Sequence, residues 1–176
     1  MIENNMENKT WRKIIFLDID GVLASNEFLI KTGGKSGFID KEKVALLNKL
    51  KPYNVEVVIS SSWGYNEDTV NTLISCGLEL PIIGGTEHFH NNWICRGNEI
   101  AKWLSDTFDN YSVFNGRPYI YDGYKGSDYE YVIIDDEVDM LMCQKNNFIH
   151  VNAYEALTED DINKAIDILE RRNLVK

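Results

Sequence analysis

Short runs of consecutive apolar residues alternate along the chain with segments whose apolar residues recur at helical spacing. The apolar runs predict strands at residues 13–18, 55–59, 80–83, 131–134 and 148–151. The periodic segments predict helices at residues 41–51, 66–76, 97–108 and about 158–173. Strands without polar alternation are typical of a parallel sheet, and strands that alternate with helices indicate right-handed βαβ units. We therefore expect an α/β fold, a doubly wound Rossmann-like parallel sheet.

Turn and capping residues support these boundaries. Asp40 can cap the helix at 41–51, and Gly77 is a natural stop for the helix at 66–76. Thr158 and Asp161 resemble a capping box at the start of the last helix, with Asp in place of the usual Glu. We expect residues 22–39 to form a flexible hairpin or loop over the end of the first strand. Residues 111–130, rich in Tyr and Gly, are expected to form a loop or hairpin.

Size and composition indicate one ordinary globular unit. The chain has 176 residues, of which 44% are hydrophobic and 26% are charged, and this is enough for a single core. We expect residues 1–10 to be a flexible tail and residues 11–176 to be a single domain. The polar start lacks the apolar segment of a signal peptide, and no run is long enough to span a bilayer.

Charge and cysteine content narrow the class of partner. The net charge of -10 argues against a broad, non-specific surface for nucleic acid or for anionic membranes, although it permits a small basic pocket for one phosphate group. The three cysteines show no CxxC spacing and fit a reducing compartment. We therefore expect a cytoplasmic protein that does not bind membranes. Its oligomeric state stays open.

Acidic and hydroxyl side chains follow three of the predicted strands. Asp18 and Asp20 end the first strand and point to the same side, and Gly21 permits a sharp turn after them. Ser60, Ser61 and Ser62 follow the second strand, and Asp135 and Asp136 follow the fourth. The carboxyl ends of parallel strands share one edge of a sheet, where such folds place ligands. Carboxylates gathered there repel one another unless a cation or a shared proton offsets them, which indicates a Mg²⁺ site for a phosphate ester.

These motifs resemble those of the haloacid dehalogenase (HAD) superfamily. The segment FLDIDGVL resembles its first motif, VVISSS its second and YVIIDD its fourth, while Arg96 in CRGNEIAKWL stands where the basic third motif belongs. The chain is similar in particular to the HAD domain of Swiss Army knife RNA-repair-like proteins and to the phosphatase module of polynucleotide end-healing enzymes. The first gap between the motifs, residues 24–39, is too short for a folded cap domain, and the second, residues 64–95, is largely taken up by a predicted helix and strand. The resemblance thus implies a capless HAD core, or one with a minimal cap, and an open site.

The resemblance also implies catalytic roles. Asp18 would be the nucleophile that attacks phosphorus. Asp20 would protonate the leaving oxygen, then deprotonate the hydrolytic water, and would bind Mg²⁺ through its backbone carbonyl. Arg96 would neutralise the developing negative charge.

Further residues would bind the metal and the phosphate. Asp18 and Asp135 would bind Mg²⁺ directly, and Asp136 would either bind it through water or orient Arg96. Asp139 is an alternative to Asp136 as the second acid of the fourth motif. The phosphate would be bound by Ser60 or Ser61 and by the backbone at Gly21. Trp63 would stack on the substrate or wall the pocket, or else belong to the core.

The implied function is Mg²⁺-dependent phosphomonoester hydrolysis on a nucleic-acid end or a nucleotide. A small-metabolite phosphatase and a non-catalytic module that binds a phosphorylated ligand are the alternatives. Two weaker features are a zinc site at His88, His90 and Cys95, and a stacking platform of tyrosines in residues 119–131. A segment that packs its own aromatic side chains is the better explanation of the tyrosines.

Overall fold

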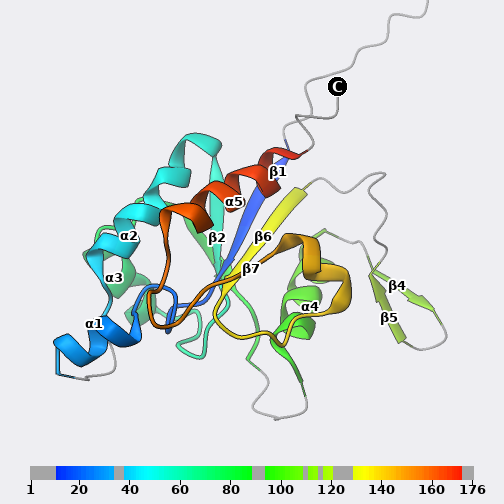
Figure 1. Ribbon diagram of the computed structural model, residues 1–176. Coiled ribbons are helices and arrows are strands. Elements are labelled where there is room, and N and C mark those ends of the chain that lie inside the picture. Colours follow the sequence, from blue (N-terminus) through cyan, green and yellow to red (C-terminus); the bar gives the residue numbers. More distant parts are fainter. Residues whose placement is uncertain are drawn as a thin grey trace, which may run out of the picture.

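The computed structural model of the protein describes residues 11–33, 38–88, 94–108, 111–114, 117–120 and 129–171 (Figure 1). Its centre is a five-stranded, entirely parallel sheet in the order β3-β2-β1-β6-β7. The strands are β1 (Arg12–Leu17), β2 (Val55–Ile59), β3 (Ile82–Gly85), β6 (Tyr129–Asp135) and β7 (Phe148–His150). The expected α/β class and parallel sheet are therefore confirmed.

Helices cover both faces of this sheet. The α-helices are α1 (Asn26–Lys31), α2 (Lys41–Leu47), α3 (Glu67–Ser75), α4 (Arg96–Phe108) and α5 (Glu159–Glu170), and the 3-10 helices are η1 (Asn48–Tyr53) and η2 (Met142–Asn147). Helices α2, α3, α5 and η1 pack on one face, and α4 packs on the other (Figure 1). This is the doubly wound arrangement that the alternating pattern predicts.

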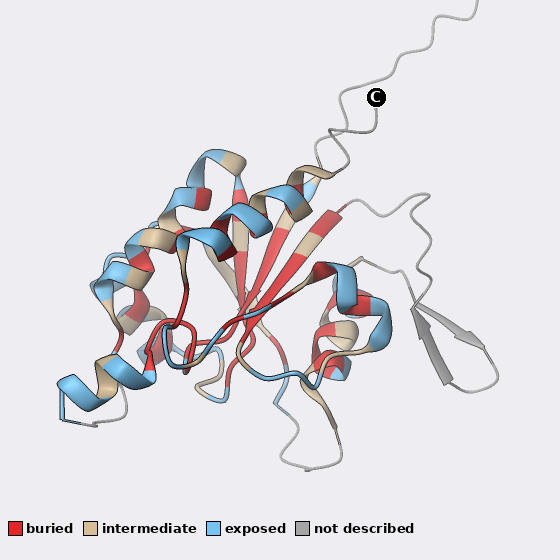
Figure 2. Ribbon diagram, in the orientation of Figure 1, coloured by how far each residue is buried: buried red, intermediate tan, exposed pale blue. Residues whose placement is uncertain are grey.

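Strand β1 shows why its sequence reads as a continuous apolar run. Its alternate residues Ile15 and Leu17 belong to the core under α2 and α5, whereas Ile14 and Phe16 belong to the core under α4. All four side chains are fully buried. Figure 2 shows the same pattern for the sheet as a whole, whose strands are buried while the helices expose their outer sides. A strand that is covered on both faces has no position for a polar side chain until it reaches the edge.

Two helical boundaries differ from the prediction. A short helix, α1, occupies part of the expected loop at 22–39, because Ser25 caps it and Glu27 and Lys31 form an ion pair of 2.7 Å at i,i+4 spacing. The helix predicted at 41–51 ends as α-helix at Leu47 and continues as η1, which contains Pro52. Proline cannot donate the helical hydrogen bond and its ring clashes with the preceding turn, so the regular helix stops early.

Strand β3 lies two residues later than predicted and includes the two glycines that were expected to follow it. A Cβ atom on Gly85 would lie 2.4 Å from the Cβ atom of Tyr65, and one on Gly84 would lie 3.4 Å from Nε1 of Trp103. The glycines are thus used where other parts of the chain approach the strand closely.

The tyrosine-rich segment at residues 111–130, for which a loop or a hairpin was expected, contains a hairpin. Strands β4 (Tyr111–Phe114) and β5 (Arg117–Ile120) pair antiparallel. Tyr129 and Tyr131 lie in β6, where Tyr129 stacks on Phe108 with ring centroids 4.2 Å apart. These two tyrosines pack in the core beside α4, and the side chains of residues 119, 121 and 124 lie outside the described part of the chain.

The last helix confirms the predicted capping box: Thr158 accepts from the backbone N–H of Asp161, and the Asp161 carboxylate accepts from the backbone N–H of Thr158. Residues 1–10 lie outside the described part of the chain, so the division into tail and domain stays a prediction. No helix within the described residues has the length and apolar character needed to cross a membrane.

Candidate active site

The polar residues that follow the strands meet at the carboxyl edge of the sheet. The backbone N–H of Asp18 donates to Ile134 at 3.0 Å, and that of Ser60 donates to Leu17 at 2.8 Å. These hydrogen bonds extend the strand pairing one residue beyond β1 and β2. They fix the first acid beside the end of β6 and the first serine beside the end of β1. Three segments far apart in sequence therefore supply one site.

Three carboxylates form a cluster at this edge. Oxygen atoms of Asp18, Asp135 and Asp136 all lie within 4.8 Å of one another. Asp18 is 7% exposed and Asp135 only 1% exposed, so both charges are largely removed from water. No other group of three metal-ligating side chains occurs among the described residues.

Gly21 makes room for the third carboxylate. Its φ is +71°, a conformation that residues with a Cβ atom rarely adopt. A Cβ atom built on it would lie 2.3 Å from Cγ of Asp136. The turn after Asp20 must therefore be glycine both for its backbone angle and for the approach of Asp136.

The cluster shifts the acidity of its members. Burial raises the pKa of Asp18 to about 7, against the opposing effects of a hydrogen bond from Ser61 and of the Arg96 charge. Burial and then the neighbouring charge of Asp18 raise the pKa of Asp135 to about 8. Burial also raises the pKa of Asp136. Three carboxylates in this space cannot all ionise comfortably without added positive charge.

The cationic residue at the site is Arg96, the first residue of α4. Its side chain is 13% exposed, and its Nε atom lies 3.8 Å from Oδ2 of Asp135. Its backbone N–H donates to Oδ2 of Asp139 at 2.8 Å. Asp139 thus caps α4, whereas Asp136 joins the carboxylate cluster. The structure gives these two candidate acids different positions.

Glu99 is a site neighbour that the sequence analysis did not single out. It is 3% exposed, and its two oxygens lie 3.4 Å from Nη1 of Arg96 and 3.5 Å from Nδ1 of His88. Its position three residues after Arg96 in a helix is a spacing that favours an ion pair, and this signal could have revealed it. Glu99 thus lies nearest Nη1 of the guanidinium, whereas Asp135 lies nearest its Nε atom.

The serines have separate surroundings. The hydroxyl of Ser60 is fully buried, and within the described structure it has no hydrogen-bond partner. Ser61 is buried and bonds to the carboxylate of Asp18, whereas Ser62 is exposed. A buried hydroxyl without a partner is uncommon, and at this edge it is available to a ligand.

Asp20 and Trp63 are paired with each other. The carboxylate of Asp20 lies outside the cluster, and its Oδ2 accepts a hydrogen bond of 2.9 Å from Nε1 of Trp63. Part of the Trp63 side chain packs against the core beneath α2. Trp63 therefore contacts both the hydrophobic core and the carboxylate of Asp20.

The donor set suits Mg²⁺. All candidate ligands are oxygens, which this cation prefers, and Oδ2 of Asp135 is buried without a hydrogen-bond partner in the described structure. The raised pKa values indicate that the folded chain lacks compensating positive charge at this point. A divalent cation would supply it.

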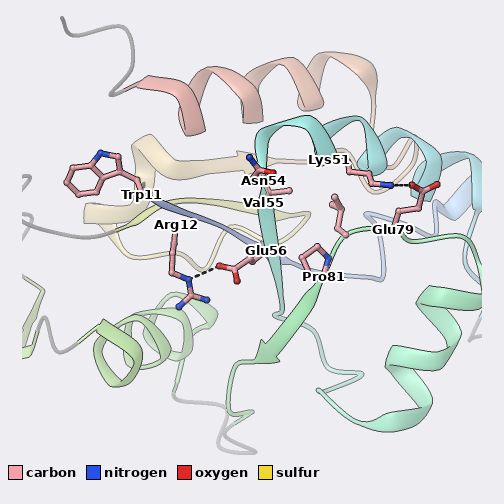
Figure 3. A pocket seen from close by; sticks show the side chains of 9 residues that line it. Trp11, Arg12, Lys51, Asn54, Val55, Glu56, Glu79 and Pro81 are labelled. Carbon is pink, nitrogen blue, oxygen red and sulfur yellow. Dashed lines mark hydrogen bonds and ion pairs between the residues drawn. The ribbon is translucent and has the colours of Figure 1, made fainter. Parts of the chain in front are cut away.

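The remaining candidates lie elsewhere. His88 contacts Glu99 and is not grouped with Cys95 as metal ligands, and residue 90 lies outside the described part of the chain. A cavity of about 430 Å³ is lined by residues that include Arg12, Lys51 and Val55 (Figure 3). Because Arg12 and Val55 begin β1 and β2, this cavity lies at the opposite end of the sheet from Asp18. Its charged lining residues pair with each other, Arg12 with Glu56 at 2.7 Å and Lys51 with Glu79 at 2.5 Å.

Comparison with known proteins gives one family. A family model described as the HAD domain in Swiss Army Knife RNA repair proteins matches residues 14–162, a range that contains every residue of the site described above. No curated protein and no solved structure gave a significant match to the chain.

Proposed function

Since the chain belongs to the family of HAD domains found in Swiss Army Knife RNA repair proteins, we propose that it is a Mg²⁺-dependent phosphomonoester hydrolase that acts through an aspartyl-phosphate intermediate. The observation that carries this proposal is the cluster of Asp18, Asp135 and Asp136 at the sheet edge. The orphan hydroxyl of Ser60 and the guanidinium of Arg96 support it, because both can bind phosphate oxygens.

Asp18, Asp135 and Asp136, with the backbone carbonyl of Asp20, are the residues that would hold Mg²⁺. When bound, the cation would offset the charges of the carboxylates and of the phosphate, so that an anionic nucleophile can approach an anionic ester. It would also keep Asp18 ionised at neutral pH, where burial otherwise raises its pKa to about 7. The ionised form is the one that can attack.

The protein groups divide the reaction between them. A carboxylate oxygen of Asp18 attacks phosphorus as the bond to the leaving oxygen breaks, and Asp20 donates a proton to that oxygen. Ser60 and Arg96 bind the transferring phosphoryl group and stabilise its negative charge. In the second half of the reaction Asp20 accepts a proton from the water that releases phosphate from Asp18.

For the substrate, we propose a phosphate at the end of an RNA strand. The description of the family as a domain of RNA repair proteins supports this class. The short gap that holds α1 leaves no room for a cap domain, and an open site suits a bulky substrate. The net charge of -10 favours instead a nucleotide or small metabolite, which is the second candidate.

The test begins with p-nitrophenyl phosphate and Mg²⁺. The wild-type protein should hydrolyse this ester, and Asp18→Asn should reduce the rate by a factor of about 10³ or more, because the amide cannot act as the nucleophile. Activity retained in Asp18→Asn would exclude the aspartyl-phosphate. Binding of phosphate or Mg²⁺ without turnover across a panel of esters would instead indicate a non-catalytic binding module.

The substrate class is tested separately. The values of kcat/KM for 3′- and 5′-phosphorylated RNA oligonucleotides are compared with those for nucleoside monophosphates and sugar phosphates. Preference for an oligonucleotide end would support the RNA-end proposal. Preference for a mononucleotide or sugar phosphate would contradict it while leaving the chemistry intact.

A further inference from the structure

We propose that Trp63 is a positioning residue that holds the side chain of Asp20 in the orientation needed for proton transfer to the leaving oxygen. This inference rests on the proposed function, in which Asp20 is the general acid. The observation that carries it is the hydrogen bond of 2.9 Å from Nε1 of Trp63 to Oδ2 of Asp20. Because an indole N–H can donate but never accept, the oxygen that it contacts must act as the acceptor. The contact therefore restricts the rotamer of the Asp20 side chain.

The indole is held in place by its own segment. The backbone carbonyl of Trp63 accepts hydrogen bonds from the side chains of Asn66 at 2.9 Å and of Thr69 at 3.2 Å. Asn66 also caps α3, since its side chain accepts from the backbone N–H of Thr69. Part of the ring packs against the core. The backbone of Trp63 is therefore anchored at the start of α3, and its ring is anchored in the hydrophobic core.

Asp20 has less support of its own. Its backbone forms an isolated bridge with Ala24, and the N–H of Gly21 donates to Ala24 at 3.1 Å, so the main chain of this turn is ordered. Its side chain, in contrast, is solvent-exposed. In the described structure its side-chain hydrogen bond comes from Trp63 alone. Without that contact an exposed carboxyl group would sample several rotamers, and fewer of them would present the proton to the ester.

The step that Trp63 serves is the first proton transfer. An oxygen of Asp18 forms the bond to phosphorus, the bond from phosphorus to the leaving oxygen breaks, and its electron pair passes to that oxygen. A proton moves from the carboxyl group of Asp20 to the same oxygen, so the alcohol leaves neutral and Asp20 becomes a carboxylate. The indole N–H stays bonded to Oδ2 throughout and stabilises the charge that develops.

The kinetic test uses two esters with Trp63→Phe, which retains an aromatic ring but lacks the donor. An alkyl phosphate needs its leaving oxygen protonated, whereas p-nitrophenolate leaves readily without a proton. We expect kcat/KM for the alkyl phosphate to fall about tenfold, a fraction of what general acid catalysis contributes, and kcat/KM for p-nitrophenyl phosphate to change little. Trp103→Phe is the matched control, because Trp103 is also partly buried but packs against Phe16 at the other face. It should not change the ratio between the two esters.

A double-mutant cycle with Asp20→Ala tests whether the effect passes through Asp20. In that background Trp63→Phe should produce no further loss with the alkyl phosphate. An equal loss in both backgrounds, or an equal loss with both esters, would assign Trp63 a merely structural role and overturn the proposal.

A spectroscopic readout does not depend on activity. The chain has 4 tryptophans, and the indole N–H signal of Trp63 is assigned by its absence in Trp63→Phe. Asp20→Ala should shift this signal upfield and speed its exchange with water, while the other indole signals stay in place. An unshifted Trp63 signal in Asp20→Ala would overturn the inference even if Trp63→Phe is inactive with both esters. If the wild-type protein hydrolyses neither ester with Mg²⁺, the proposed function falls and this inference with it. Normal activity with an unchanged ester ratio in Trp63→Phe would overturn the inference alone.

Discussion

At the scale of single residues, the site depends on a glycine whose missing side chain leaves room for a neighbouring carboxyl group. Gly21 combines a φ of +71° with a position where a Cβ atom would overlap the carboxyl group of Asp136. Gly77, at the end of α3, has a φ of +100° but nothing within 4 Å of its missing Cβ atom. The two glycines thus separate the effect of backbone angle from the effect of crowding.

We predict that Gly21→Ala damages the site more than Gly77→Ala. A left-handed backbone angle costs about 1–2 kcal/mol for a residue with a Cβ atom, so both variants should lose stability in urea denaturation. Gly21→Ala should lose more, and it should also weaken Mg²⁺ binding, because Asp136 must move. Equal stability and equal Mg²⁺ affinity in the two variants would contradict the crowding argument.

Glu99 gives a second prediction at this scale. Glu99→Gln keeps the size of the side chain but removes the charge that faces Arg96 at 3.4 Å. We expect kcat to fall about tenfold, which is less than the loss of a group that contacts the transition state directly. Asp106→Asn on the same helix is the control, since its ion pair with Lys102 is exposed. It should leave kcat unchanged, and an equal effect of both substitutions would remove Glu99 from the site.

At the scale of elements, the start of α4 is tied to the loop after β6. The side chain of Asp139 accepts from the N–H of Arg96 at 2.8 Å, and the side chain of Gln144 donates to the carbonyl of Gly97 at 2.9 Å. A Cβ atom on Gly97 would lie 2.4 Å from the backbone nitrogen of Leu141. The segment that follows Asp135 therefore sets the position of the helix that carries Arg96.

This arrangement predicts different outcomes at Asp136 and Asp139. Asp139→Asn should retain stability and Mg²⁺ affinity, because the amide oxygen of asparagine can accept the same hydrogen bond from the N–H of Arg96. Asp139→Ala should lose about 1 kcal/mol of stability, because it removes one hydrogen bond. Asp136→Asn should instead lose Mg²⁺ affinity, measured by calorimetric titration. A similar loss of affinity in Asp139→Asn would make Asp139 a metal ligand.

At the scale of the whole molecule, the acidic cluster links folding to pH and to metal. Burial raises the pKa of Asp18 to about 7 and that of Asp135 to about 8 in the folded chain. The ordinary value for aspartate in an unfolded chain is about 3.9. At pH values between the unfolded and the folded pKa, the folded chain binds more protons than the unfolded chain. The contribution of Asp18 and Asp135 to stability therefore falls as pH rises from about 4 to 8. In the proposed function Mg²⁺ would bind the deprotonated carboxylates and oppose this loss.

We therefore predict a pH-dependent response to Mg²⁺ in thermal unfolding. After treatment with EDTA, Asp135→Asn should have a higher Tm than the wild type at pH 8, and this difference should shrink toward pH 5. Added Mg²⁺ should raise the Tm of the wild type more at pH 8 than at pH 5, and should leave that of Asp135→Asn nearly unchanged. A Mg²⁺ effect of the same size at both pH values would contradict the raised pKa values.

Much of the fold could be predicted because its signals are local in the chain. Buried parallel strands must be apolar, and their ends turn polar at the sheet edge, so the positions of β1 and β2 follow from the sequence almost to the residue. The capping box at Thr158 is equally local. The errors arose where a neighbour from elsewhere in the chain decides the conformation, as at Gly85 in β3, which Tyr65 approaches closely.

The sequence by itself determined the class of fold, the family resemblance and the set of strand-end acids, because composition and short-range order suffice for each. Only the tertiary structure decided which of those residues lie together and which contacts each of them makes. It brings Asp136 to Asp18 while Asp139 caps α4, and it leaves the Ser60 hydroxyl unpaired. It also joins Trp63 to Asp20. These relations depend on distances between segments that lie dozens of residues apart, and such distances exist only once the sheet has assembled.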